Sequence, residues 1–141
     1  MRTKNFIWIL FILLLVLGTT GFSPKKVYCR LILTTDLTND TPVNDLTGIP
    51  INTDKILVYT YWYNLTVDKE YDYKIAIFDG EKNILLFAPT KFTPSDSSWH
   101  TLTTYKVNPQ LDKPGKWRFQ VYLDNKLKAK RELDVDEDKK N

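Results

Sequence analysis

The chain has few of the residues that catalytic and metal sites most often require, with one His, one Cys and five Gly among 141 residues. A single cysteine excludes an internal disulfide. One histidine leaves little from which to build a nucleophile with its base, and zinc needs three or four His, Cys or carboxylate ligands. The glycines form no Gly-x-Gly-x-x-Gly phosphate loop. The sequence therefore predicts no catalytic residue, no metal ion and no cofactor.

Carboxylates are the remaining candidates for chemistry. Asp36, Asp40 and Asp45 could offer oxygen ligands to Ca²⁺, but their spacing matches no EF-hand loop, and Asp and Asn are ordinary turn formers. Two distant carboxylates could also converge for glycoside hydrolysis, although nothing singles out a pair. We therefore expect a protein that is not an enzyme. The alternative is a small exported enzyme or enzyme inhibitor whose site leaves no recognisable pattern.

Residues 1–23 have the composition of an export segment. Arg2 and Lys4 precede an apolar run from Phe6 to Leu17, and small residues follow from Gly18 to Ser23. A basic head, a short apolar run and a small-residue exit are typical of a secretory signal peptide. The uncharged stretch reaches Pro24, so an uncleaved N-terminal membrane anchor is the alternative. We expect an extracytoplasmic protein (periplasmic, cell-surface or secreted) that meets the membrane only through this segment, if it is retained.

The charge balance argues against nucleic acid as a partner. Of the 20 Lys and Arg residues, two lie in the export segment, so 18 basic residues face 17 acidic ones in the remainder, a net charge of +1. A nucleic-acid-binding domain usually carries a strongly basic surface.

Residues 24–135 follow the two-residue period of β-strands. Expected strands span residues 27–34, 56–63, 71–78, 84–88, 102–107, 117–123 and 127–135, with a long linking loop over 36–50. All seven prolines fall between these segments, and Asp124-Asn125 predicts a two-residue hairpin turn. The pattern predicts an all-β domain, an antiparallel two-sheet sandwich of about seven strands, with a closed barrel as the alternative. Its core should include Trp117, Phe119, Val121 and the inward side of residues 56–62, and residues 136–141 should form a charged flexible tail.

The C-terminal part resembles a known family. Pro114-Gly115, Trp117, Asp124-Asn125 and the closing Leu133-Asp134-Val135 resemble the last hairpin of bacterial immunoglobulin-like and fibronectin type III-like domains. The resemblance implies this fold over about residues 27–135. It also implies that Trp117 stands where the family usually has a corner Tyr, so that an indole N–H would make the corner hydrogen bond. It implies no activity, because function depends on a site and not on a fold.

One strand carries a regular row of tyrosines. Tyr59, Tyr61 and Tyr63 alternate with Val58, Thr60 and Trp62, which places the three phenols on one face at a spacing of roughly 6.6–7 Å. Together with the loops beside Trp99, this row is the predicted binding surface, for a protein or carbohydrate partner in the envelope or outside the cell. The alternative is that a loop of the protein itself covers the tyrosines, which would make them purely structural.

Overall fold

The computed structural model of the chain describes residues 23–137, and all regular structure in this range is β. Residues 1–22 of the predicted export segment (1–23) and residues 138–141 of the predicted charged tail (136–141) lie outside the described residues. The strands are β1 (Tyr28–Thr34), β2 (Leu37–Thr38), β3 (Thr41–Pro42), β4 (Gly48–Pro50), β5 (Lys55–Tyr63), β6 (Tyr71–Phe78), β7 (Ile84–Phe92), β8 (Trp99–Lys106), β9 (Gly115–Leu123) and β10 (Lys126–Asp136). The seven long strands correspond to the seven expected, and β2, β3 and β4 are short additions.

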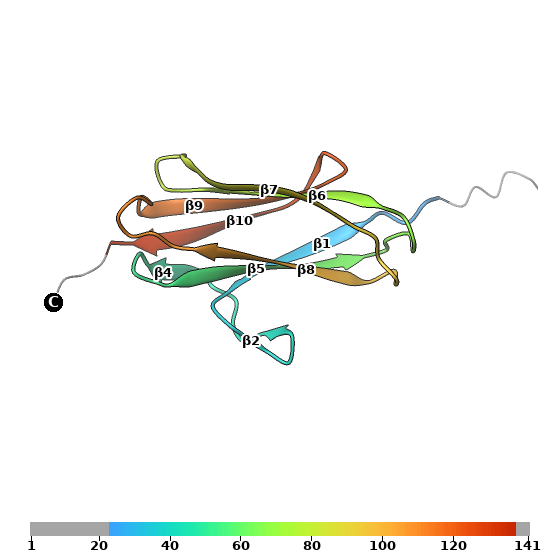
Figure 1. Ribbon diagram of the computed structural model, residues 1–141, viewed down its shortest axis with the longest axis horizontal. Helices are drawn as coiled ribbons and strands as arrows, with labels where there is room; N and C mark the ends of the chain where they lie inside the picture. The colour runs from blue at the N-terminus through green and yellow to red at the C-terminus, as the bar shows by residue number, and fades with distance from the viewer. Residues whose placement is uncertain (1–22, 138–141) are drawn as a thin grey trace, which may run out of the picture.

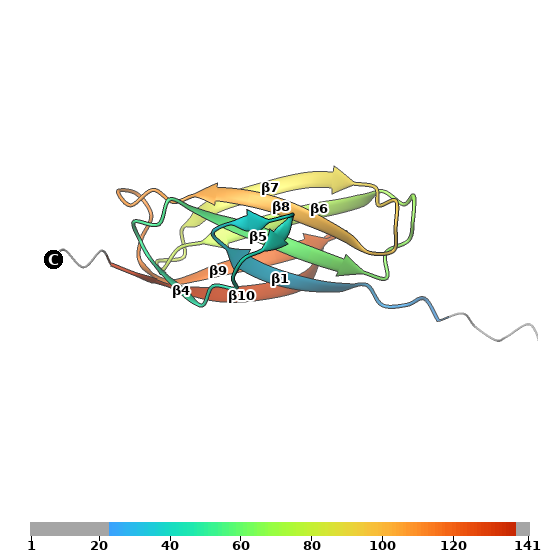
Figure 2. The same ribbon diagram turned by 90° about the horizontal axis from the view of Figure 1, so that it is seen from below.

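The long strands form two sheets that pack face to face (Figures 1 and 2). One sheet has the order β1-β5-β8, and the other has the order β4-β10-β9-β6-β7. All pairings of long strands are antiparallel, as expected, but β4 pairs in parallel with β10. The prediction of a wholly antiparallel sandwich is therefore corrected at this one edge.

The core lies between the sheets and follows the predicted alternation. Trp117, Phe119 and Val121 are fully buried, because these positions on β9 all point to the inner face. On β5 the inner side chains Val58 and Trp62 are also fully buried. The expected core residues are therefore confirmed.

The corner before β9 is built as the family resemblance implies. The indole N–H of Trp117 donates to the carbonyl oxygen of Lys113 at 2.7 Å. Gly80 packs so closely against this corner that a Cβ there would lie 1.9 Å from the carbonyl oxygen of Pro114, so no other residue fits. The turn after β9 is also as predicted, since Asp124 and Asn125 have φ values of 48° and 64°, which is the geometry of a type I′ hairpin turn.

The segment between β1 and β5 is not the loop that we expected. Its turn-forming residues do make turns, but between them lie the small hairpin β2–β3 and the strand β4. The hairpin lies under the outer face of the three-stranded sheet, where Figure 2 shows it in front of β5. The segment then crosses to the other sheet, where Gly48 and Ile49 pair with Asp134 and Val135.

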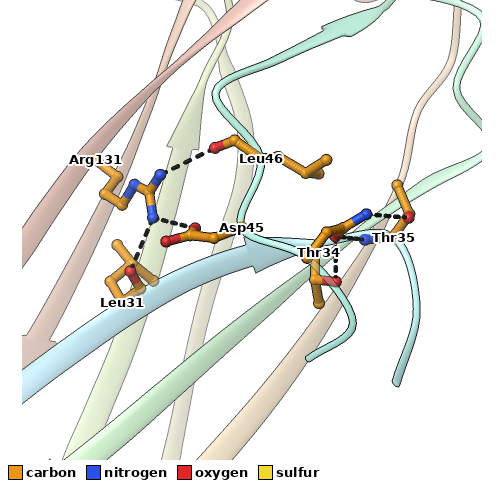
Figure 3. A network of polar contacts seen from close by, with 7 residues as sticks. Leu31, Thr34, Thr35, Asp45, Leu46 and Arg131 are labelled. Carbon is orange, nitrogen blue, oxygen red and sulfur yellow. Dashed lines mark hydrogen bonds and ion pairs between the residues drawn. The ribbon is translucent and has the colours of Figure 1, made fainter. Parts of the chain in front are cut away.

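Arg131 fastens this segment to the sandwich (Figure 3). Its register partner is Phe119, so the side chain lies on the inner side of β10, at the open edge beside β1. The guanidinium donates to the carbonyl oxygens of Leu31 at 3.3 Å and Leu46 at 3.0 Å and forms an ion pair with Asp45. One side chain thereby connects β10, β1 and the linking segment.

Proline placement differs from the prediction. Pro42, Pro50 and Pro89 lie within β3, β4 and β7, not between strands. β4 and β7 are the edge strands of the five-stranded sheet, and an edge strand tolerates a residue without an N–H donor. For this reason β7 continues past Pro89 to Phe92.

Candidate functional site

The predicted tyrosine row is present on the outer face of β5, but its members differ in exposure. Tyr61 is 37% exposed and Tyr63 is 39% exposed. Their ring centroids are 5.5 Å apart with the planes 23° from parallel. The ring of Tyr59 lies 5.8 Å from that of Tyr61 on its other side. The three rings therefore form a continuous row along the strand.

Tyr59 is only 3% exposed. The rings of Tyr61 and His100 pack on it, and the β2–β3 hairpin lies against this outer side of the sheet (Figure 1), with Asp40 near the Tyr59 hydroxyl. Burial raises the pKa of its hydroxyl, and the nearby Tyr61 and Asp40, which lies on the hairpin turn, raise it further. At Tyr59, therefore, a segment of the protein itself covers the row, which was the alternative to an exposed binding surface. It does not reach far enough to bury Tyr61 and Tyr63.

Trp99 and the tyrosines occupy different sides of the three-stranded sheet. Trp99 pairs with Trp62, whose side chain is fully buried, and Trp99 itself is half-buried against the core. The next residue, His100, points outward, because adjacent residues of a strand face opposite ways. Its ring stacks on that of Tyr59, with centroids 5.4 Å apart and planes 8° from parallel. His100, not Trp99, is therefore the residue of β8 that joins the tyrosine row.

The pairing of β1 and β8 with β5 places further residues beside the tyrosine row, which the sequence did not single out. Tyr28 and Arg30 of β1 lie opposite Tyr63 and Tyr61, and Leu102 of β8 lies opposite Tyr59. Tyr28 is 56% exposed and Leu102 is 46% exposed. Only the antiparallel registers of β1 and β8 on β5 could have shown this, since each residue taken alone fits an ordinary strand. We use the name tyrosine face for this exposed surface, which consists of Tyr28, Arg30, Tyr61, Tyr63, His100 and Leu102.

The orientation of the rings decides what this face offers to a ligand. Tyr61 lies between Tyr59 and Tyr63, and the stacked ring of Tyr63 covers one of its π faces, whereas the ring of Tyr59 is tilted by 43°. A sugar that stacks on an aromatic residue needs an uncovered ring face. Tyrosines packed against one another in this way, each with its hydroxyl, are suited to contacts in a protein interface.

Metal-binding side chains do not cluster among the described residues. Within residues 23–137 no three His, Cys, Asp or Glu side chains lie close enough to hold a metal ion. Of the three aspartates considered for Ca²⁺, Asp36 accepts a hydrogen bond from the N–H of Leu37, and Asp45 pairs with Arg131. No helix in the same range is long and apolar enough to cross a membrane.

Cys29 lies on the inner side of β1 and is half-buried and free. Burial raises the pKa of its thiol to about 12, and the charge of Lys128 opposes this shift only in part. The thiol is therefore protonated at neutral pH and is a poor nucleophile there.

Comparison with known proteins identifies the fold. No protein-family model matches the sequence, and no curated protein matches it. Among solved structures, an immunoglobulin-like protein from Pseudomonas aeruginosa is similar over 81% of this chain and 99% of its own, with a TM-score of 0.54 and 11% identity. Part of the Pseudomonas fluorescens alkylpurine DNA glycosylase AlkC, solved bound to DNA containing an abasic site analogue, is similar over 77% of this chain and 30% of its own, with a TM-score of 0.53 and 11% identity. At such identities the likeness concerns the fold alone, which is an immunoglobulin-like β-sandwich.

Proposed function

We propose that this chain is an exported, non-catalytic binding module that recognises a protein partner through the tyrosine face. The observation that carries the proposal is the exposure of Tyr61 and Tyr63 in a row of contacting rings. A tyrosine contributes a large contact area and a hydroxyl at a small cost in side-chain entropy. Arg30, opposite Tyr61, adds an arginine, which together with tyrosine and tryptophan is enriched among the residues that dominate binding energy.

A protein partner fits this geometry better than a carbohydrate does. The rings of Tyr61 and Tyr63 stack on each other, so at least one face of each is covered. Exposed Tyr28 and Leu102 extend the face on both sides of the row, which gives a broad surface and not a narrow sugar platform. A carbohydrate partner is the second outcome that the experiments must separate.

The proposed location rests on residues 1–23 and places the partner in the envelope or outside the cell. N-terminal sequencing of the mature protein tests this part. A new N-terminus near residue 22–24 would support cleavage of a signal peptide, whereas intact Met1 in the membrane fraction would support the retained anchor.

The binding surface is tested by crosslinking from within the tyrosine face. A photo-reactive amino acid at position 63 should capture a specific protein from the native envelope fraction, whereas the same amino acid at Gln120, on the opposite sheet, should not. With the captured partner purified, Tyr61→Ala should weaken binding by roughly thirtyfold, the cost of about 2 kcal/mol typical of a dominant interface residue.

Stability measurements separate binding from folding. Because Tyr61 is more than one-third exposed, Tyr61→Ala should hardly move the thermal midpoint, whereas Tyr59→Ala should lower it clearly, since Tyr59 is buried under the hairpin. Unchanged binding by Tyr61→Ala and Tyr63→Ala would show that this face is not the contact surface. Binding to a glycan array that is lost in Tyr61→Ala would reassign the face to carbohydrate.

A further inference from the structure

The outer face of the five-stranded sheet carries a second, unrelated feature. The registers of β10, β9, β6 and β7 place outward side chains in three rows across the sheet. These rows are Leu127-Tyr122-Lys74-Pro89, Lys130-Gln120-Ala76-Phe87 and Glu132-Arg118-Phe78-Ile84. The middle row has its smallest side chain, Ala76, surrounded by larger ones. Figure 1 shows the β2–β3 hairpin under the three-stranded sheet and no corresponding element of residues 23–137 over this sheet.

The short side chain of Ala76 leaves a hollow. It has a volume of about 280 Å³ and is bounded by Phe78, Ile84, Phe87, Tyr122 and the pair Lys74 and Asn125. Ala76 is 3% exposed and forms the floor, whereas Phe87 is 58% exposed and stands at the wall.

A second hollow of about 340 Å³ adjoins the first, because Lys74 and Asn125 border both. It continues past Pro89 and Thr90 to Lys91 and Asp72. Together the two hollows follow β6 from Phe78 to Asp72, a length of about 20 Å at the rise of a β-strand. The groove is therefore long and shallow, with aromatic walls at one end and polar groups at the other.

The aromatic rings of this groove differ from those of the tyrosine face. In the part of the chain that the structure describes, neither Phe87 nor Tyr122 has another aromatic ring in contact. The hydroxyl of Tyr122 donates to the side-chain oxygen of Gln120 at 2.8 Å, which holds the ring in place beside the floor. Phe87 is 58% exposed, so its ring offers surface on which a sugar can stack.

The charged side chain shared by the two hollows is basic, namely Lys74. Lys74 as a whole is half-buried, and its ammonium donates to the side-chain oxygen of Asn125, which fixes it at the junction of the two hollows. Arg118, on the neighbouring strand β9, lies one row from Ala76, with its guanidinium 5.4 Å from the centre of the Phe78 ring and Glu132 opposite it, whereas Lys130 lies in the row of Ala76 but two strands away. Asp72, at the far polar end, lies 3.8 Å from Lys91. An acidic group would therefore be favoured beside Lys74.

We propose that this groove binds an acidic oligosaccharide, a chain of sugars that carry carboxylates such as uronic acids. One sugar ring lies over Ala76 against the rings of Phe87 and Tyr122, and its carboxylate pairs with the ammonium of Lys74. The chain continues along β6 toward Thr90 and Lys91, where hydroxyl groups meet polar side chains. This site lies on the other sheet from the tyrosine face and does not depend on the function proposed for it.

Titration of the full domain with tetragalacturonate and with the neutral cellotetraose tests the proposal, with chemical shifts or calorimetry as the readout. Tetragalacturonate should bind at least about tenfold more tightly than cellotetraose, and added salt should weaken it. Phe87→Ala, which removes a wall, and Ala76→Leu, which fills the hollow, should each weaken binding about tenfold or more. Lys74→Gln should remove the preference for the acidic chain.

Tyr63→Ala is the matched control, because it removes an exposed ring from the opposite sheet and should bind tetragalacturonate as the unchanged protein does. Thermal midpoints of all variants establish that they are folded, and Phe87→Ala keeps the test valid if Ala76→Leu does not fold. The proposal is overturned if the folded, unchanged protein binds neither tetragalacturonate nor an oligomannuronate. It is also overturned if cellotetraose binds equally well, or if folded Phe87→Ala binds as tightly as the unchanged protein.

Discussion

Replacing Arg131 by Met tests how far one side chain holds the two sheets and the linking segment together. Met keeps an apolar stem of similar length but removes the guanidinium, so the carbonyl oxygens of Leu31 and Leu46 lose their charged donor. Hydrogen bonds to charged groups contribute roughly 1.5–3 kcal/mol each where they are well protected. The ion pair with Asp45, whose side chain is 46% exposed, contributes about 1 kcal/mol or less. Since the site is only partly buried, we expect a loss of about 2–4 kcal/mol in the free energy of unfolding.

Urea unfolding followed by tryptophan fluorescence measures this loss. Arg131→Lys is the matched control, because a lysine is a single point charge that cannot reach both carbonyl oxygens at once. It should retain only part of the stability. Asp45→Asn should cost about 1 kcal/mol or less, since it removes the ion pair and leaves both carbonyl contacts. In Arg131→Met the amide of Leu46, which donates to the carbonyl of Leu33 at 2.7 Å, should exchange faster with solvent. A loss below about 1 kcal/mol in Arg131→Met would refute the reasoning.

Three further perturbations have defined outcomes. Phe119→Ala should lower the free energy of unfolding by about 3–5 kcal/mol in urea titrations, because the ring is fully buried; a loss below about 1 kcal/mol would contradict that burial. Trp117→Phe keeps an aromatic ring but removes the donor to Lys113, and should cost about 1–3 kcal/mol; an unchanged urea midpoint would show that the corner bond contributes nothing. Burial by itself raises the pKa of Asp79, but hydrogen bonds from Asn83, Glu81 and Lys113 outweigh it and lower the pKa below its ordinary value. Asp79 therefore stabilises the fold above the unfolded pKa of about 4, and this contribution disappears as the pH falls through the lowered folded pKa. In Asp79→Asn the free energy of unfolding should depend less on pH over this acidic range. The same pH dependence in the variant and the unchanged protein would contradict this role of Asp79.

Much of the fold followed from local patterns. The alternation around Trp117 and Phe119 identified β9 and its inner face, because a sheet buried on one side requires a two-residue period. Asp124 and Asn125 marked the hairpin turn, since both residue types tolerate positive φ. The strand β4 was missed because Gly48–Pro50 is short, contains a proline, and is held only by pairing with a strand at the other end of the chain. A local pattern contains no information about such a partner.

In the candidate sites too, local patterns predicted some features, whereas contacts between distant segments determined the others. Alternation along β5 placed Tyr61 and Tyr63 on the outer face, but the burial of Tyr59 depends on the β2–β3 hairpin, which folds back from an earlier part of the chain. Trp99 was grouped with the tyrosines, although its exact position in β8 turns it to the inner face. The groove over Ala76 was not foreseen, because Phe87 and Tyr122 become its walls only when three strands are set in register.

The closure of the sandwich by β10 has a consequence for the order of folding. Arg131 is 100 residues from Leu31 and 85 residues from Leu46. The strand β4 can pair only after residues 134–136 have been added to the chain. Contacts between such distant segments form only after large loops have closed, and β-sandwiches rich in them fold on a scale of milliseconds to seconds. A chain still missing its last dozen residues has therefore neither its linking segment fastened nor its five-stranded sheet complete. During synthesis, the linking segment and the five-stranded sheet can therefore be completed only once β10 is available to pair.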